Sequence, residues 1–126
     1  MQTFILLTLG PVSEAFELPP TIHDEAKREG LELSDQVKYG KRHISFSSQR
    51  DGSYLEGHFI AEQNTFFNLG ALVRAELPDV PLQVGCVIYG DHQTGVFFDN
   101  MQLRRMADLG MTLDIDVYDI AEDDEG

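Results

Sequence analysis

Two stretches of the chain, residues 42–49 and 81–90, place apolar residues at every second position, which is the pattern of β-strands. Residues 42–49, RHISFSSQ, place Ile44 and Phe46 on one face and serines on the other, so we expect a strand with one solvated face. Residues 81–90, PLQVGCVIYG, place four apolar side chains on one face: Leu82, Val84, Cys86 and Ile88. The shorter run GVFFD, residues 95–99, predicts another strand beside it.

Strands are also expected at both ends of the chain. Residues 3–9 form a compact apolar run that ends at Gly10-Pro11, which predicts a buried strand. Residues 111–119, MTLDIDVYD, alternate again and predict the last strand. There we expect the apolar side chains to face the core: Leu113, Ile115 and Val117.

Helical spacing of apolar residues appears in two places. Residues 53–77 predict two consecutive helical pieces, broken near Asn64; the competing interpretation is a hairpin that turns at Asp51-Gly52. Residues 100–109 predict a helix with Asp99 or Asn100 as its N-cap, Gly110 as its left-handed C-terminal residue, and an apolar stripe. The stripe comprises Leu103, Met106 and Ala107.

The segment between the first two predicted strands gives weaker signals. Ser13 can cap a single helical turn that Pro19-Pro20 would stop. Residues 21–41 are polar and charged, and predict a loop or a weakly held helix over residues 24–28.

From Arg42 onward the predicted order is strand, helix, strand, strand, helix, strand. This order predicts an α+β fold with a ferredoxin-like split βαβ core, to which the N-terminal strand is an addition. We expect one domain over residues 1–120 and an acidic, disordered tail over residues 121–126.

The net charge of the chain limits the kinds of partner that it can bind. Aspartate and glutamate number 22 against nine lysines and arginines, for a formal net charge of −13. Such a chain is expected to avoid nucleic acids and anionic membranes, which are polyanions, and to suit a basic protein partner. One cysteine and a first apolar run without preceding basic residues are typical of a cytoplasmic protein.

The acidic ending carries the main candidate residues. Asp114 and Asp116 alternate with apolar positions, so both carboxylates should project from one strand face. An Asp-x-Asp of this kind resembles that of haloacid-dehalogenase-type phosphotransferases, but no phosphate-binding helix or glycine-rich loop follows it. The histidines lack zinc spacing, and no nucleotide-binding or nucleophile motif is present. We therefore expect a solvated strand face, with no metal, no cofactor and no catalytic residue.

The last third of the chain carries a recognisable combination of residues: Leu109, Gly110, Leu113, Asp114, Ile115, Asp116, Val117 and Tyr118. In these residues it resembles a small bacterial family known as domain of unknown function 4279. The resemblance implies a strand, a short helix and a final strand in this order. It implies no enzymatic activity, because the family has no established reaction.

Three functions remain open from the sequence. The first is an immunity protein or antitoxin that neutralises a bacterial toxin by direct binding, with Asp114, Asp116 and Asp119 in the contact. The second is a small regulatory or ligand-binding domain. The third is a metal-dependent enzyme that uses Asp114 and Asp116.

Overall fold

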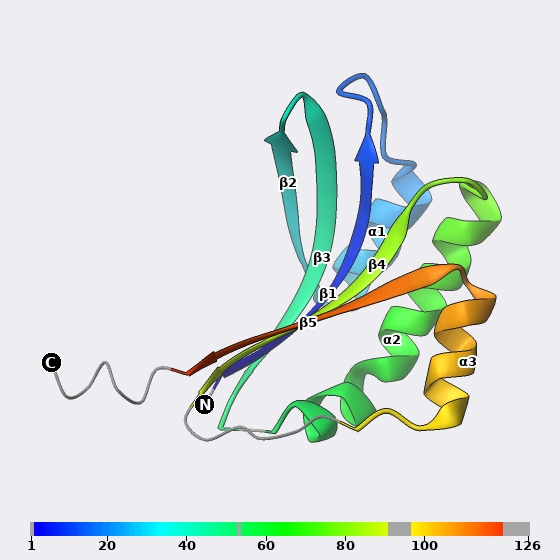
Figure 1. Cartoon of the computed structure of the whole chain (residues 1–126). Coiled ribbons are helices and arrows are strands. Elements are labelled where there is room, and N and C mark those ends of the chain that lie inside the picture. The colour runs from blue at the N-terminus through cyan, green and yellow to red at the C-terminus, as the bar shows by residue number, and fades with distance from the viewer. Residues whose placement is uncertain (1, 53, 91–96, 120–126) are drawn as a thin grey trace, which may run out of the picture.

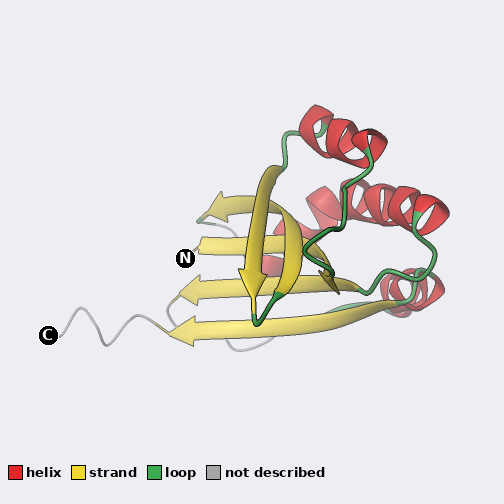
Figure 2. Ribbon diagram, turned by 90° about the horizontal axis from the view of Figure 1, so that it is seen from above, coloured by secondary structure: helices red, strands yellow, loops and turns green. Residues whose placement is uncertain are grey.

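The fold is an α+β single domain, seen in a computed structural model that describes residues 2–52, 54–90 and 97–119. Its elements are β1 (Gln2–Val12), α1 (Pro20–Arg28), β2 (Glu32–Lys38), β3 (Lys41–Asp51), α2 (Leu55–Glu76), β4 (Leu82–Gly90), α3 (Asn100–Asp108) and β5 (Met111–Asp119). The strands form one sheet in the order β2-β3-β1-β4-β5. All three helices lie on the same side of this sheet, and its strands fan strongly from β2 to β5 (Figures 1 and 2).

β1 occupies the centre of the sheet. It pairs antiparallel with β3 along one edge and with β4 along the other, so the interpretation of this strand as an addition to the core is wrong. Ile5, Leu7 and Leu9 are fully buried on its helix side. A compact apolar run belongs in the centre because both of its backbone edges are then hydrogen-bonded and one whole face is covered.

β1 also runs past the residues that were expected to end it. The pairing register with β3 shifts between Leu9 and Val12, so the strand continues through Gly10 and Pro11 as an irregularity. Gly10 has φ +128°, and a β-carbon there would stand 2.6 Å from the carbonyl oxygen of Arg42. Glycine is therefore required for the two strands to approach each other at this point.

The ferredoxin-like order predicted from Arg42 is not the order that the described residues show. The expected strand over residues 95–99 is not formed at Phe97–Asp99, which have no regular structure; Gly95 and Val96 lie outside the described residues. Asp99 instead caps α3, and the crossover through α3 brings β5 parallel to β4. The sheet is consequently mixed, with β3 and β4 both antiparallel to β1 and joined by α2.

The segment 20–41 is more ordered than its composition indicated. Pro20 is the first residue of α1, a position at which proline needs no N–H partner, so Pro19-Pro20 precedes a helix and does not stop one. β2 was not predicted because every one of its residues is exposed and most are polar. It forms by pairing with β3 through the loop Tyr39-Gly40, whose positive φ angles of 53° and 74° are those of a tight hairpin turn.

α2 is a single unbroken helix of 22 residues. The predicted break at Asn64 is absent, and so is the hairpin alternative through Asp51-Gly52. Packing along the helix overrides the weak propensity of its glycines. At Gly70 a β-carbon would stand 2.1 Å from Met111 Cε, so the end of the methionine side chain occupies the space that the glycine leaves. No helix in the described part of the chain is long and apolar enough to cross a bilayer.

α3 forms as its end signals predict. Asp99 accepts a hydrogen bond from the Gln102 N–H, and the Gln102 side chain accepts one from the Asp99 N–H, which makes a complete capping box. Gly110 has φ +65° at the other end. The predicted stripe is wrong in part, because Leu103 and Ala107 are exposed, whereas Met106 is buried together with the polar Gln102.

The core prediction for β5 is also wrong in part. Leu113 packs against the core, but the exposed fractions of Ile115 and Val117 are 38% and 51%. A helix rises about 1.5 Å and a strand about 3.3 Å per residue, so the nine residues of α3 cover less than half the length of β5. Val84, Cys86 and Ile88 on the neighbouring β4 are buried as predicted.

Candidate binding surface

The sheet has one face that none of the described helices covers, which we call the open face. Side chains that alternate with the buried ones project from it on all five strands. They include Gln36 and Lys38 on β2, His43 and Ser45 on β3, Phe4, Leu6 and Thr8 on β1, Gln83, Gly85, Val87 and Tyr89 on β4, and Asp114, Asp116 and Tyr118 on β5.

One end of the open face is aromatic. Phe4 meets Tyr89 edge-on with ring centroids 5.8 Å apart, and Tyr89 stacks on Tyr118 at 5.0 Å. The three rings therefore cross β1, β4 and β5 in one row. Such a row gives a rigid, amphipathic surface, because each ring is held by its neighbour and tyrosine also carries a polar hydroxyl.

A hollow of about 380 Å³ lies next to the aromatic row. Its floor includes Gly85, where a β-carbon would contact only the side chain of Leu6 at 3.8 Å, so the missing side chain leaves space over the strand. The polar side chains around it come from all five strands: Thr8, Gln36, Lys38, His43, Ser45, Gln83, Asp114 and Asp116. Thr8 and Ser45 are joined through their hydroxyl groups at 2.9 Å.

The two predicted aspartates stand side by side in this hollow. Asp114 lies beside Gly85 and Asp116 beside Val87 in the register of β4 and β5, and both are exposed. A hydrogen bond between the two carboxyl groups raises the pKa of Asp114, and burial and the negative charge of Asp116 add to this effect. Neither carboxylate forms an ion pair with any residue that the structure describes.

The remaining predicted contact residue is only partly placed. Asp119 ends β5, where it lies beside Gly90, but its side chain is outside the described part of the structure. The acidic tail, residues 121–126, lies outside the described residues as well. The structure thus brings Asp114 and Asp116 together on the open face and leaves the placement of the Asp119 carboxylate open.

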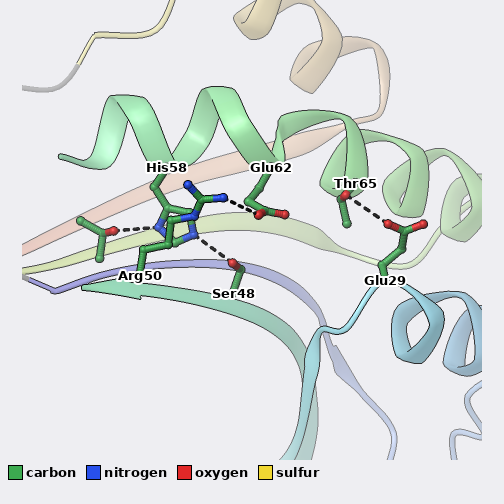
Figure 3. A network of polar contacts seen from close by, with 7 residues as sticks. Glu29, Ser48, Arg50, His58, Glu62 and Thr65 are labelled. Carbon is green, nitrogen blue, oxygen red and sulfur yellow. Dashed lines mark hydrogen bonds and ion pairs between the residues drawn. The ribbon is translucent and has the colours of Figure 1, made fainter. Parts of the chain in front are cut away.

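A second polar cluster lies on the helix side of the sheet (Figure 3). His58 of α2 is fully buried; its Nδ1 lies 2.7 Å from Thr3 Oγ1 on β1 and its Nε2 lies 2.9 Å from Ser48 Oγ on β3. Arg50 donates to Glu62 beside it at 3.0 Å. Burial lowers the pKa of His58, as does the positive charge of Arg50, while Glu62 opposes the shift.

The polar cluster around His58 has a structural role. In the neutral imidazole one ring nitrogen donates and the other accepts, and hydroxyl groups can take either role, so both contacts are satisfied. Ser48 beside His58 has the spacing of a nucleophile and its base, but the second ring nitrogen meets the hydroxyl group of Thr3, where a catalytic triad would place a carboxylate. The arrangement therefore links β1, β3 and α2 at one buried point.

Other candidate chemistry is sparse. Burial raises the pKa of the Cys86 thiol to about 12, with a contribution from Asp114, so this cysteine stays protonated at neutral pH. Within residues 2–52, 54–90 and 97–119, no three histidine, cysteine, aspartate or glutamate side chains lie close enough to hold a metal ion.

Sequence reasoning missed the aromatic row, the position of Lys38 and His43 in the hollow, and the Thr3-His58-Ser48 cluster. The first two depend on which strands are neighbours. Phe4 and Tyr89 meet because β1 lies beside β4 in the sheet. Lys38 reaches the hollow because residues 32–38 form the strand β2, which the sequence did not predict. The sequence signal that could have revealed β2 was Tyr39-Gly40, a two-residue turn that precedes the alternating residues of β3.

Comparison with known proteins identifies no relative: no family model matches the chain, and neither a curated protein nor a solved structure matches it.

Proposed function

We propose that this protein is a non-enzymatic, acidic binding protein that acts by direct contact with another protein. The particular function that we propose is that of an immunity protein or antitoxin, which neutralises a basic domain of a bacterial toxin in the cytoplasm. The observation that carries the proposal is the pair Asp114 and Asp116, held side by side on the open face without an ion-pair partner among the described residues.

Like charges held together disfavour the isolated fold, and a cationic group from a partner would remove this cost. Both carboxylates stand on a β-strand, so their backbone is already ordered and little entropy is lost on docking. A net charge of −13 adds long-range attraction to a basic partner, which increases the association rate.

The test is to co-express this protein with toxin domains whose genes lie next to its own gene in the natural host. We expect the wild-type protein to protect the cells and the double variant Asp114→Asn, Asp116→Asn to lose protection. The control is Asp24→Asn with Asp79→Asn, which removes the same charge from exposed positions elsewhere. Equal protection by both double variants would mean that the acid pair is not in the contact; no protection by the wild type would reject the immunity function.

A small-ligand function is the second candidate, and the hollow beside Gly85 favours it. Its volume of about 380 Å³ is within the range of small-molecule sites, and its lining mixes charged, hydroxyl and apolar groups. Gly85→Val should fill part of this hollow without disturbing the strand, since a β-carbon there makes only ordinary contact. A metabolite that raises the melting temperature of the wild type but not of Gly85→Val would favour this second function.

A further inference from the structure

β5 is an edge strand whose two faces carry different chemistry. It pairs with β4 along one side, and no described strand pairs with its other side. An edge strand of nine residues presents a row of backbone N–H and C=O groups that a further strand can use. Proteins often block such edges with proline, a bulge or charged side chains. β5 contains no proline or lysine and keeps regular register with β4 throughout, and its charged side chains are aspartates, which repel an acidic strand but attract a basic one.

The helix side of this edge is apolar and exposed. Ile115 and Val117 point toward the helix layer, yet α3 is too short to cover them, and their exposed fractions are 38% and 51%. The open side of the same strand carries Asp114 and Asp116, followed by the half-exposed Tyr118. A strand laid beside β5 would therefore meet aliphatic side chains on one face and carboxylates on the other.

We propose that β5 binds an extended segment of the partner protein as an additional strand of the sheet, and that this segment alternates basic with aliphatic residues. The inference rests on the proposed function and specifies the chemistry of its partner. Side chains directly opposite each other on neighbouring strands lie on the same face. Lysine or arginine of the partner thus stands next to Asp114 and Asp116, while its aliphatic residues cover Ile115 and Val117.

A second copy of this chain does not fit the same edge. Two β5 strands paired antiparallel about Ile115 would bring Asp114 of one chain opposite Asp116 of the other, and like charges opposite each other are destabilising. Each copy also carries a net charge of −13. Charge complementarity therefore selects a basic segment over self-association.

The other edge strand, β2, does not offer the same match. Its central acid, Asp35, is already neutralised by Arg42 through a bidentate contact at 2.6 and 3.2 Å, which lowers the pKa of Asp35. Lys38 ends the strand and would repel a basic segment. Val37 on β2 is as exposed as Val117 on β5, so the two edges supply matched positions for an experiment.

The probe is a short, capped peptide that alternates arginine with valine. Its control has the same composition, with all arginines at one end and all valines at the other, so that charge is equal but alternation is lost. We expect the alternating peptide to bind several-fold more tightly in fluorescence anisotropy. Hydrogen exchange of the full chain should slow at the amides of residues 112–118 and stay unchanged at those of β2.

Two single variants locate the contact. Asp116→Asn and Val117→Thr should each weaken binding of the alternating peptide by about two- to fivefold, the effect of one cross-strand pair. Val37→Thr and Asp79→Asn are the controls and should leave binding unchanged. All four positions are exposed, and thermal unfolding checks that each variant is folded.

Equal binding of the two peptides, protection at β2, or self-association that excludes the peptide would overturn the inference. These outcomes are separable from a failure of the proposed function. If the acid pair is needed for protection against a toxin but the alternating peptide does not bind β5, the partner uses the open face and not the edge. If the peptide binds β5 as expected but no toxin is neutralised, the edge site stands and the immunity function fails.

Discussion

His58 shows how a single buried residue connects the helix layer to the sheet. A lone histidine in a helical segment carries no signal for its partners, which lie 55 and 10 residues away along the chain. Only the packing of α2 against β1 and β3 reveals that Thr3 and Ser48 satisfy both ring nitrogens. A buried imidazole that is satisfied in its neutral form makes stability depend on pH.

We predict that unfolding free energy falls as pH drops from about 7.5 to 5.5, because of His58. Its pKa is lowered in the folded state, so below the unfolded value of about 6.5 the unfolded chain binds a proton that the folded chain does not. The contribution is fully present above that value and decreases as pH falls, by at most about 1.4 kcal/mol per pH unit.

Urea titrations at several pH values measure this decline. His58→Gln should be less stable at pH 7.5 but should lack the decline due to the buried imidazole. His23→Gln, at an exposed histidine of α1, is the control and should behave like the wild type. Parallel pH profiles for His58→Gln and wild type would contradict the assignment.

At the scale of elements, β4 and β5 have similar sequence patterns but differ in how much of each strand the helices cover. Both strands alternate, and both place aliphatic residues on the helix side. β4 lies under α2 and is buried, whereas α3 shields only the first part of β5. The same pattern therefore gives a core strand in one case and an exposed edge in the other.

We predict that Ile88→Ala on β4 costs about 2–5 kcal/mol of unfolding free energy, the range for a fully buried aliphatic side chain. Ile115→Ala on β5 should cost less than half as much, since its side chain is 38% exposed and less apolar area is lost. Urea midpoints of the two variants make the comparison directly. Equal losses would mean that the distal half of β5 is covered.

For the whole molecule, the net charge of −13 is the dominant feature, and on the open face it includes the adjacent carboxylates Asp114 and Asp116. The described ion pairs involve acids of α1, β2 and α2, and none reaches the carboxylates of β5. The neighbouring Asp116 raises the pKa of Asp114, so the two carboxylates disfavour each other's ionised form.

We predict that Asp116→Asn increases stability at pH 7 by less than about 1 kcal/mol, because it relieves repulsion between exposed carboxylates. The gain should shrink as salt rises from about 0.01 to 1 M, since the screening length falls from about 30 to 3 Å. Asp79→Asn removes the same charge at another exposed position and is the control. A loss of stability in Asp116→Asn at low salt would show that the pair is not strained.

The sequence by itself determined the elements whose signals are local. β3, β4, β5 and α3 appear within a few residues of their predicted limits, because side-chain alternation, the Asp99 cap and Gly110 act over one strand or one helical turn. It also placed Asp114 and Asp116 together on one solvated face, since the period of a strand is enough for that.

Only the tertiary structure decided the features that depend on pairing between distant strands and on burial by the helices. β2 forms because β3 offers it an edge, α2 stays continuous because the sheet supports it along its length, and β1 is central because it is the strand that both β3 and β4 can pair with. The hollow at Gly85 and the exposed edge of β5 follow from that arrangement. Local patterns specify which face of a strand is apolar, but the neighbours that cover it are brought there by the rest of the chain.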